Sequence, residues 1–229
     1  NPVFTVGNQL REAIELHTDR KGKEAEARAI EMLTLVGVNE PEKRVKQYPY
    51  ELSGGMRQRV MIAMALACEP DILIADEPTT ALDVTIQAQI LELMQSLQKK
   101  LGMAIIMVTH DLGVIADMCD EIIVMYGGRV CERGTAEDIF YRPHHEYTKG
   151  LLRSIPNVDR IGEKLIPIPG TPINLLNMPK GCAFCPRCEE AMKICIEEQP
   201  PEMQMPDGHF ASCWLNVKAA MEEEKGGRQ

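Results

Sequence analysis

Two adjacent carboxylates, Asp76 and Glu77, directly follow a short apolar run, Ile72–Ala75. Such a run is typical of a strand buried in a parallel sheet, and ligands of open parallel sheets bind beyond the carboxyl ends of the strands. An aspartate placed there can hold Mg²⁺ through water, and the next glutamate can take a proton from an attacking water molecule. The pair alone is equally typical of a solvated strand end, so both interpretations stay open on this pattern.

A second segment, Ser53-Gly54-Gly55, has the residue types of a phosphate contact. Ser53 can cap the helix that follows, while the two glycines let a phosphate approach the free N–H groups at its start. The helix dipole favours a negative charge in this place. An ordinary glycine-containing turn capped by serine is the alternative.

His110 comes two residues after the next apolar run, Ala104–Val108. A lone histidine at the end of a strand is more often structural than catalytic. Beside a metal–phosphate site, however, it could bond a γ-phosphate or orient the attacking water. Asp83 lies between these motifs and is expected to cap a helix.

The elements around these motifs alternate between strand and helix. Helical spacing runs from Val6 to Val36, and again after Asp83. Ile122–Tyr126 and Arg129–Glu132 flank Gly127-Gly128, which predicts a two-residue hairpin. The pattern predicts an α/β fold whose parallel sheet is covered on both faces.

In this order and spacing the motifs resemble those of the ABC ATPase family, over roughly Asn1 to Arg133. The resemblance implies a catalytic role for Glu77 and His110, and a nucleotide-binding role for Ser53, Gly54, Gly55, Asp76 and Asp83. Asp76 is also the implied Mg²⁺ ligand, through water. In the family's terms these are the signature motif at Leu52–Met56, the Walker B strand at Ile72–Asp76, the D-loop at Ala81–Asp83 and the switch His110.

The implied fold is a partial P-loop NTPase of the ABC type. It divides into a helical, signature-bearing part (1–68), a RecA-like core (69–134) and a C-terminal oligopeptide-transporter extension (135–229). The sequence begins without Met and holds no G-x-x-x-x-G-K-[ST]. We therefore interpret it as a C-terminal fragment lacking the P-loop and Q-loop, and expect no ATPase activity from it alone.

Two segments point to one branch of the family. Asn1–Phe4 and Tyr48–Val60 resemble the ATPases of oligopeptide and dipeptide importers, in which Met56 replaces a glutamine common elsewhere. This resemblance implies ATP and Mg²⁺ as cofactors, a second ATPase subunit, identical or different, and two transmembrane permease subunits. An extracytoplasmic peptide-binding protein is an indirect partner. The implied location is peripheral, on the cytoplasmic face of the membrane.

Five of the eight cysteines fall between Cys182 and Cys213. No secretory signal precedes them, so bound metal explains their density better than disulfides. Iron–sulfur clusters and zinc both take about four sulfur ligands. The spacing of Cys182, Cys185 and Cys188 begins like a ferredoxin motif, but the next cysteine arrives too late for one.

The resemblance to the importer extension implies that four of these cysteines hold a [4Fe–4S] cluster, and leaves Cys185 as the extra one. Zn²⁺ and unligated thiols remain the alternatives. The implied ligands are Cys182, Cys188, Cys195 and Cys213. Cys68, Cys119 and Cys131 are expected to be buried small hydrophobic residues.

Composition limits the other interpretations. The net charge of −9 argues against a nucleic-acid binder, and no apolar run approaches the roughly 18 residues that span a bilayer. A non-transport ABC ATPase of the DNA-repair or chromosome type should carry long heptad arms before the signature helix, and none is present. A purely iron–sulfur or zinc-binding module explains only about the last fifty residues.

Overall fold

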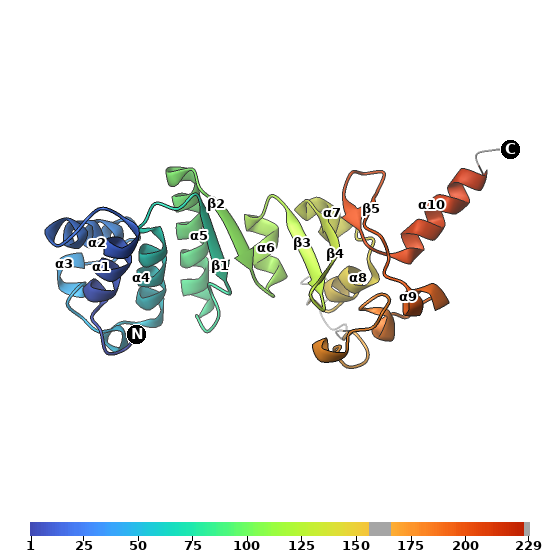
Figure 1. Cartoon of the computed structure of the whole chain (residues 1–229), viewed down its shortest axis with the longest axis horizontal. Coiled ribbons are helices and arrows are strands. Elements are labelled where there is room, and N and C mark those ends of the chain that lie inside the picture. The colour runs from blue at the N-terminus through green and yellow to red at the C-terminus, as the bar shows by residue number, and fades with distance from the viewer. Residues whose placement is uncertain (156–165, 227–229) are drawn as a thin grey trace. The chain divides into compact units, whose positions relative to one another are not determined.

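The computed structural model describes residues 1–155 and 166–226, with side chains up to residue 222 in the last helix. The chain forms two compact units, Asn1–Val114 and Ile115–Gln229, and each is described by itself (Figure 1). Along the chain, the two units meet between Val114 and Ile115, and each unit is held together by contacts within itself. The three-part division expected from the motifs stays a prediction.

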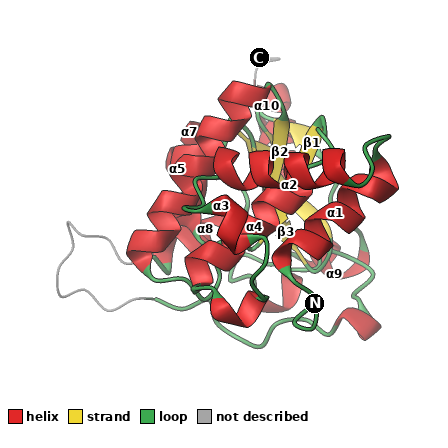
Figure 2. Cartoon of the chain, turned by 90° about the vertical axis from the view of Figure 1, so that its left-hand side faces the viewer, coloured by secondary structure: helices red, strands yellow, loops and turns green. Residues whose placement is uncertain are grey.

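The first unit begins with a group of helices. They are α1 (Val6–His17), α2 (Lys23–Leu35), α3 (Pro41–Arg44), a 3-10 turn (Pro49–Glu51) and α4 (Gly54–Leu66). Figure 2 shows these helices in red near the N-terminus. Thr5 starts α1 by accepting a hydrogen bond from the Asn8 amide. Leu10, Ile14 and Leu33 are fully buried between α1, α2 and α4, so the predicted helical spacing is confirmed.

Two parallel strands carry the predicted motifs. They are β1 (Ile72–Asp76) and β2 (Ala104–Val108), joined through α5 (Val84–Leu101). The strands pair in register from Ile72 opposite Ala104 to Asp76 opposite Val108. Helix α5 ends at Gly102, whose φ of 68° is the left-handed conformation that closes many helices.

The expectation that both faces of this sheet are covered is wrong for the part of the chain that the structure describes. Leu73 and Ala75 are buried, but Ile72, Ile74 and Ile106 are more than half exposed. Apolar residues at every strand position predicted two buried faces. Burial, however, requires a segment packed against each face, and the described residues cover only one.

The second unit is built on a four-stranded antiparallel sheet in the order β3-β4-β6-β5. The strands are β3 (Ile122–Tyr126), β4 (Arg129–Gly134), β5 (Met203–Gln204) and β6 (Phe210–Ala211). Gly127 and Gly128 both have positive φ, and β3 pairs with β4 across them, so the predicted hairpin is confirmed. The remaining elements are α6 (Leu112–Met118), which crosses the unit boundary, α7 (Ala136–Tyr141), α8 (Glu146–Arg153), α9 (Lys193–Glu197), α10 (Trp214–Gly226) and two 3-10 turns (Leu175–Asn177, Cys185–Arg187).

A small aromatic core joins this sheet to the cysteine region. Tyr126 and Phe184 meet edge to face with their ring centroids 5.3 Å apart, and Tyr147 packs against both. Cys131 and Ala183 complete the buried cluster. The cysteine-rich segment is therefore anchored to β3 and β4 by apolar packing.

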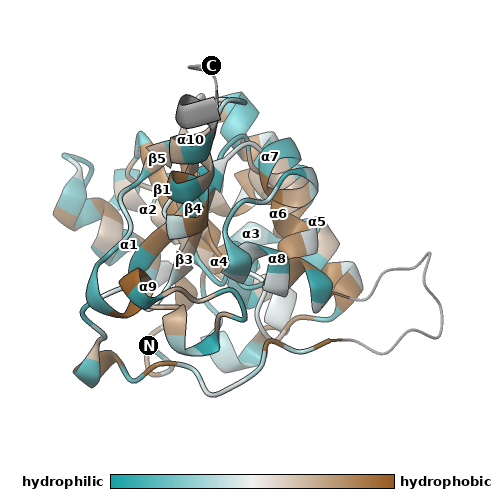
Figure 3. Ribbon diagram, turned by 90° about the vertical axis from the view of Figure 1, so that its right-hand side faces the viewer, coloured by the Kyte–Doolittle hydropathy of each residue, from teal (hydrophilic) through white to brown (hydrophobic). Residues whose placement is uncertain are grey.

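Brown, hydrophobic residues and teal, hydrophilic ones are mixed along the helices in Figure 3. None of the described helices combines the length and the hydrophobicity that a membrane crossing requires.

Candidate functional site

Glu77 leaves the end of β1 in an unusual backbone conformation. Its φ is 44°, in the left-handed region that few non-glycine residues adopt. Its N–H donates to the Val108 carbonyl at 2.8 Å, which continues the contact with β2 one residue beyond the strand. Such conformations persist where the surroundings enforce them, often at functional sites.

Two side chains hold the Glu77 carboxylate. The Thr80 hydroxyl donates to Oε2 at 2.6 Å, and His110 Nδ1 lies 3.0 Å from Oε1. The hydrogen bond from Thr80, followed by that from His110, lowers the pKa of Glu77 below its ordinary value of 4.5. Glu77 is thus ionised at neutral pH and can accept a proton.

His110 is positioned for contact with a ligand. An ionised carboxylate only accepts hydrogen bonds, so Nδ1 carries the proton in this pair. A neutral ring then keeps Nε2 as an acceptor. The side chains of His110 and Glu77 are 78% and 42% exposed, so both are open to water and substrate.

Asp76 is the last residue of β1 and is exposed. It lies opposite Val108, two residues before His110. The structure therefore brings Asp76, Glu77 and His110 to the same end of the β1–β2 pair, as the sequence predicted. Their individual roles stay predictions.

Ser53 caps α4, with its Oγ accepting from the Met56 amide at 3.3 Å. The start of this helix lies close to the first turn of α5 and to the loop before it. A Cβ added at Gly55 would come within 2.7 Å of Ile86 Cγ2, and one at Gly54 within 3.4 Å of Leu82 Cδ2. The glycines thus permit a close approach between these two segments.

Asp83 caps α5 by accepting from the Ile86 amide at 3.0 Å, so its predicted capping role is confirmed. Its nucleotide-binding role stays a prediction. An open hollow of about 280 Å³ beside Ser53 and Gly55 is also lined by Arg44 and Arg59. Asp76, Glu77 and His110 do not line it. The predicted residues therefore form two groups, one around Glu77 and one around Ser53.

All five clustered cysteines line one small cavity in the second unit. They are Cys182, Cys185, Cys188, Cys195 and Cys213. The Cys182 amide donates to the Cys195 carbonyl at 2.8 Å. A Cβ added at Gly181 would lie 2.2 Å from that same carbonyl oxygen, so glycine is required for this approach.

Burial controls the protonation of these thiols. It raises the pKa of Cys188 to about 12 and raises the pKa values of Cys182, Cys185 and Cys213 as well. These four thiols are therefore protonated at neutral pH, and a metal that binds any of them must displace its proton.

The three isolated cysteines differ in burial. Cys131 is 5% exposed, as predicted, and burial raises its pKa to about 12. Cys68 and Cys119 are only partly buried, so the expectation of full burial is wrong for them. Each lies within two residues after the end of a helix.

Sequence reasoning missed two features of the polar structure. Thr80 lies three residues after Glu77, and that spacing could have marked it as a turn partner. Glu132 and His209 form a fully buried pair at 3.2 Å. They are 77 residues apart, and no local pattern connects them.

Comparison with protein families gives two matches. The family described as "ABC transporter" matches residues 2–80, and "Oligopeptide/dipeptide transporter, C-terminal region" matches residues 131–195. Among solved structures, the ATP-binding cassette MJ0796 bound to ADP and Pi has a TM-score of 0.52 and 32% identity. The match covers 59% of this chain and 58% of that one. The chain therefore contains the mixed α/β fold of an ABC nucleotide-binding domain.

Curated relatives match almost the whole chain. The dipeptide transport ATP-binding protein DppD of Bacillus subtilis is 53% identical over 96% of this chain and 66% of its own length. The oligopeptide transport ATP-binding protein OppD of the same organism is 56% identical over 94% of this chain and 60% of its own length. The chain thus spans less than two thirds of these two proteins.

A third relative is covered more fully. The oligopeptide transport ATP-binding protein AppD of Bacillus subtilis is 50% identical over 100% of this chain and 68% of its own length. The chain belongs to the family of ATP-binding proteins of oligopeptide and dipeptide ABC transporters.

Proposed function

We propose that this chain is part of an ATP-hydrolysing subunit that energises the import of dipeptides or oligopeptides through an ABC transporter. The observation that carries the proposal is the exposed Glu77 carboxylate, held in place by Thr80 and His110 at the end of β1. The two family matches on one chain support the transport branch.

In this proposal each group near β1 has one task. Glu77 takes the proton of the attacking water, because its carboxylate is ionised and exposed. His110 orients that water by accepting a hydrogen bond at Nε2, or, when both ring nitrogens carry a proton, donates from Nε2 to the γ-phosphate. Asp76 holds Mg²⁺ through water; the ion supplies positive charge against the phosphates.

The segment Ser53-Gly54-Gly55 acts on a different nucleotide. Ser53 and Gly55 line a hollow that Glu77 does not line. Arg44 and Arg59 line the same hollow, at the start of α4. Backbone N–H groups at a helix start suit a phosphate. We propose that this segment contacts ATP held by a second ATPase subunit.

The proposed partners are that second subunit, identical or different, and two transmembrane permease subunits. An extracytoplasmic peptide-binding protein acts with them indirectly. The proposed location is the cytoplasmic face of the membrane, held there by the permeases. The relatives' names, which include peptide transport and ATP binding, support this assembly.

A chimera tests the transport function. The part of Bacillus subtilis DppD that precedes its match to this chain is joined before Asn1 and expressed in a strain lacking DppD. We expect dipeptide uptake to return, and to be lost with Glu77→Gln. A folded chimera that hydrolyses ATP without restoring uptake, or that purifies with DNA, favours the non-transport ABC ATPase instead.

We also propose that the cysteine cavity binds a [4Fe–4S] cluster through Cys182, Cys188, Cys195 and Cys213. The five thiols line one cavity, and burial together with neighbouring cysteines raises the pKa values of Cys182 and Cys213, so a bound cation would stabilise the thiolate forms that metal ligation requires. Neither family match names a metal. The cluster would fix a small segment through sulfur ligation.

The sulfur spacing favours a cluster over a single zinc ion. Tetrahedral zinc with Zn–S bonds of about 2.3 Å needs sulfur atoms about 3.8 Å apart. Among the described residues, no three of these sulfur atoms lie within 4.8 Å of one another. A four-iron cluster takes each cysteine on a separate iron, so its ligand sulfur atoms lie farther apart than those of a single zinc ion.

Iron and sulfide analysis of anaerobically purified protein tests this assignment. We expect about four irons per chain, unchanged in Cys185→Ser and largely lost in Cys188→Ser. Cys185 is the matched control because it lines the same cavity. Zinc without iron, or equal iron loss in both variants, would overturn the assignment.

A further inference from the structure

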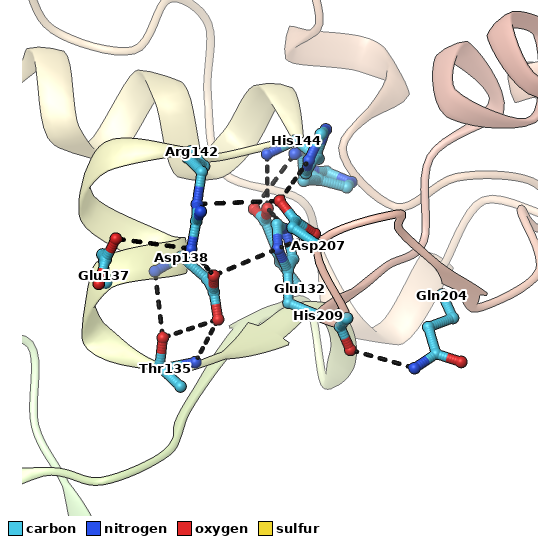
Figure 4. Close-up of polar contacts among 11 residues, drawn as sticks. Glu132, Thr135, Glu137, Asp138, Arg142, His144, Gln204, Asp207 and His209 are labelled. Atoms are coloured by element: carbon cyan, nitrogen blue, oxygen red, sulfur yellow. Dashed lines mark hydrogen bonds and ion pairs between the residues drawn. The ribbon is translucent and has the colours of Figure 1, made fainter.

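A polar network lies in the second unit around the buried pair Glu132 and His209, and none of its residues has been given a role above. His144 comes from the connection between α7 and α8, while Asp207 and His209 come from the turn between β5 and β6 (Figure 4). Their ligand atoms lie within 4.8 Å of one another. We propose that His144, Asp207 and His209 bind a divalent transition-metal ion of the zinc type.

The ring of His209 has two different neighbours. Nε2 lies 3.2 Å from Glu132 Oε1, and both side chains are completely buried. Nδ1 lies 2.9 Å from Asp207 Oδ1, yet it makes no hydrogen bond of acceptable geometry. If Nε2–H donates to Glu132, the lone pair of Nδ1 faces a carboxylate oxygen. A positive species is required between these two atoms.

The charges around the ring also call for a cation. Three carboxylates, those of Glu132, Asp138 and Asp207, lie around it, as Figure 4 shows. The guanidinium of Arg142 pairs mainly with Asp138, at 2.6 Å, and lies 3.9 Å from Asp207. With neutral imidazoles, two negative charges remain uncompensated, and a divalent ion balances them.

The distances fit nitrogen and oxygen ligands of zinc. Zinc bonds of about 2.0–2.2 Å place tetrahedral ligand atoms about 3.3–3.6 Å apart. His144 Nε2 lies 3.6 Å from Asp207 Oδ2, and Asp207 Oδ1 lies 2.9 Å from His209 Nδ1. Small side-chain shifts therefore suffice to form the site.

Glu132 would support the ion without touching it. A metal-bound histidine usually donates its other N–H to a carboxylate, which fixes the ring and raises its basicity. Glu132 occupies that position relative to His209 Nε2, and it also accepts from the amides of His144 and His145. One carboxylate of β4 thus orders both segments that supply ligands.

The ion would connect three segments of the second unit: β4, the α7–α8 connection and the β5–β6 turn. Its role is structural, because the two-residue strands β5 and β6 pair with few hydrogen bonds. The proposal is independent of ATP hydrolysis and of the cysteine cavity.

The test is zinc binding by the 229-residue protein after removal of metal, measured against a competing chelator. X-ray absorption separates the two sites, since Zn–S bonds are about 2.3 Å and Zn–N bonds about 2.0–2.1 Å. The variants are His144→Gln and Asp207→Asn, whose side chains are 29% and 22% exposed and tolerate replacement. His17→Gln, in α1, is the matched control.

We expect wild type and His17→Gln to bind one zinc through nitrogen and oxygen, and both site variants to bind it at least about 10-fold more weakly. Circular dichroism confirms the fold of each variant. Equal affinity in all four proteins overturns the proposal. So does zinc bound only through sulfur, which would mean that a proton, and not a metal, separates His209 from Asp207.

Discussion

The hydroxyl of Thr80 stabilises the ionised form of the Glu77 carboxylate. It donates to Oε2 at 2.6 Å and is the largest cause of the lowered pKa. A hydrogen bond to the charged form stabilises that form. The hydrogen bond therefore contributes stability above the pKa that Glu77 has in the unfolded chain. This contribution is lost as the pH falls through the lower pKa of Glu77 in the folded protein.

Thr80→Val should therefore raise the pKa of Glu77 toward 4.5. The measurement is a carboxyl-carbon NMR titration of the 229-residue protein without Mg²⁺. Thr109→Val is the control, because the Thr109 hydroxyl accepts from the Asp111 amide and does not bond Glu77. An unchanged pKa in Thr80→Val, or an equal rise in the control, contradicts the assigned cause.

The contact between α4 and α5 depends on glycine at one position. A Cβ at Gly55 would approach Ile86 Cγ2 to 2.7 Å. This methyl group belongs to a β-branched side chain in a helix, whose χ1 has little freedom. Overpacking lowers the stability of the fold by about 1–3 kcal/mol. Replacing glycine by alanine in a helix raises it by up to about 1 kcal/mol.

Gly55→Ala should consequently lower the free energy of unfolding by about 1–2 kcal/mol. Chemical denaturation measures this value. Gly54→Ala is the matched control: it is next to Gly55, its added Cβ would meet Leu82 at an ordinary 3.4 Å, and we expect a change within about 0.5 kcal/mol. In a background that carries Ile86→Ala, Gly55→Ala should cost much less free energy of unfolding, because the methyl group that it would clash with is gone. The same cost in both backgrounds would refute the clash.

The local sequence pattern predicted most of the longer strands and the hairpin, but not the short strands or the burial of each sheet face. The apolar runs became β1, β2 and β3, and Gly127-Gly128 became the predicted hairpin. The strands β5 and β6 were not predicted, since two residues carry no periodicity. The open face of the β1–β2 pair was not predicted either, because burial depends on segments distant in sequence.

The same distinction applies to the sites. Glu77 and His110 were predicted together because each follows a strand of one parallel pair, and such strands end at the same edge. The cysteines were found because they are close in sequence. The network of Glu132, His144, Asp207 and His209 was not predicted, since only tertiary folding brings its segments together.

The whole chain combines two units with different polar chemistry. The first unit holds an ionised base, while the second holds protonated thiols and a buried histidine–carboxylate network. The two side chains that bond the Glu77 carboxylate, Thr80 and His110, belong to the first unit, so removal of a metal proposed for the second unit should leave the pKa of Glu77 unchanged.

Hydrolysis by the 229-residue chain alone should be absent. Glu77 is ionised and placed to act as a base, but no G-x-x-x-x-G-K-[ST] occurs in the 229 residues. Without that loop, no backbone N–H groups and lysine cradle the β- and γ-phosphates, so the water that Glu77 would activate has no positioned target. The measurement is phosphate release with Mg²⁺-ATP, with Glu77→Gln prepared in parallel to report contaminating ATPases. Equal rates in the two proteins agree with the prediction, and a wild-type rate clearly above that of Glu77→Gln contradicts it.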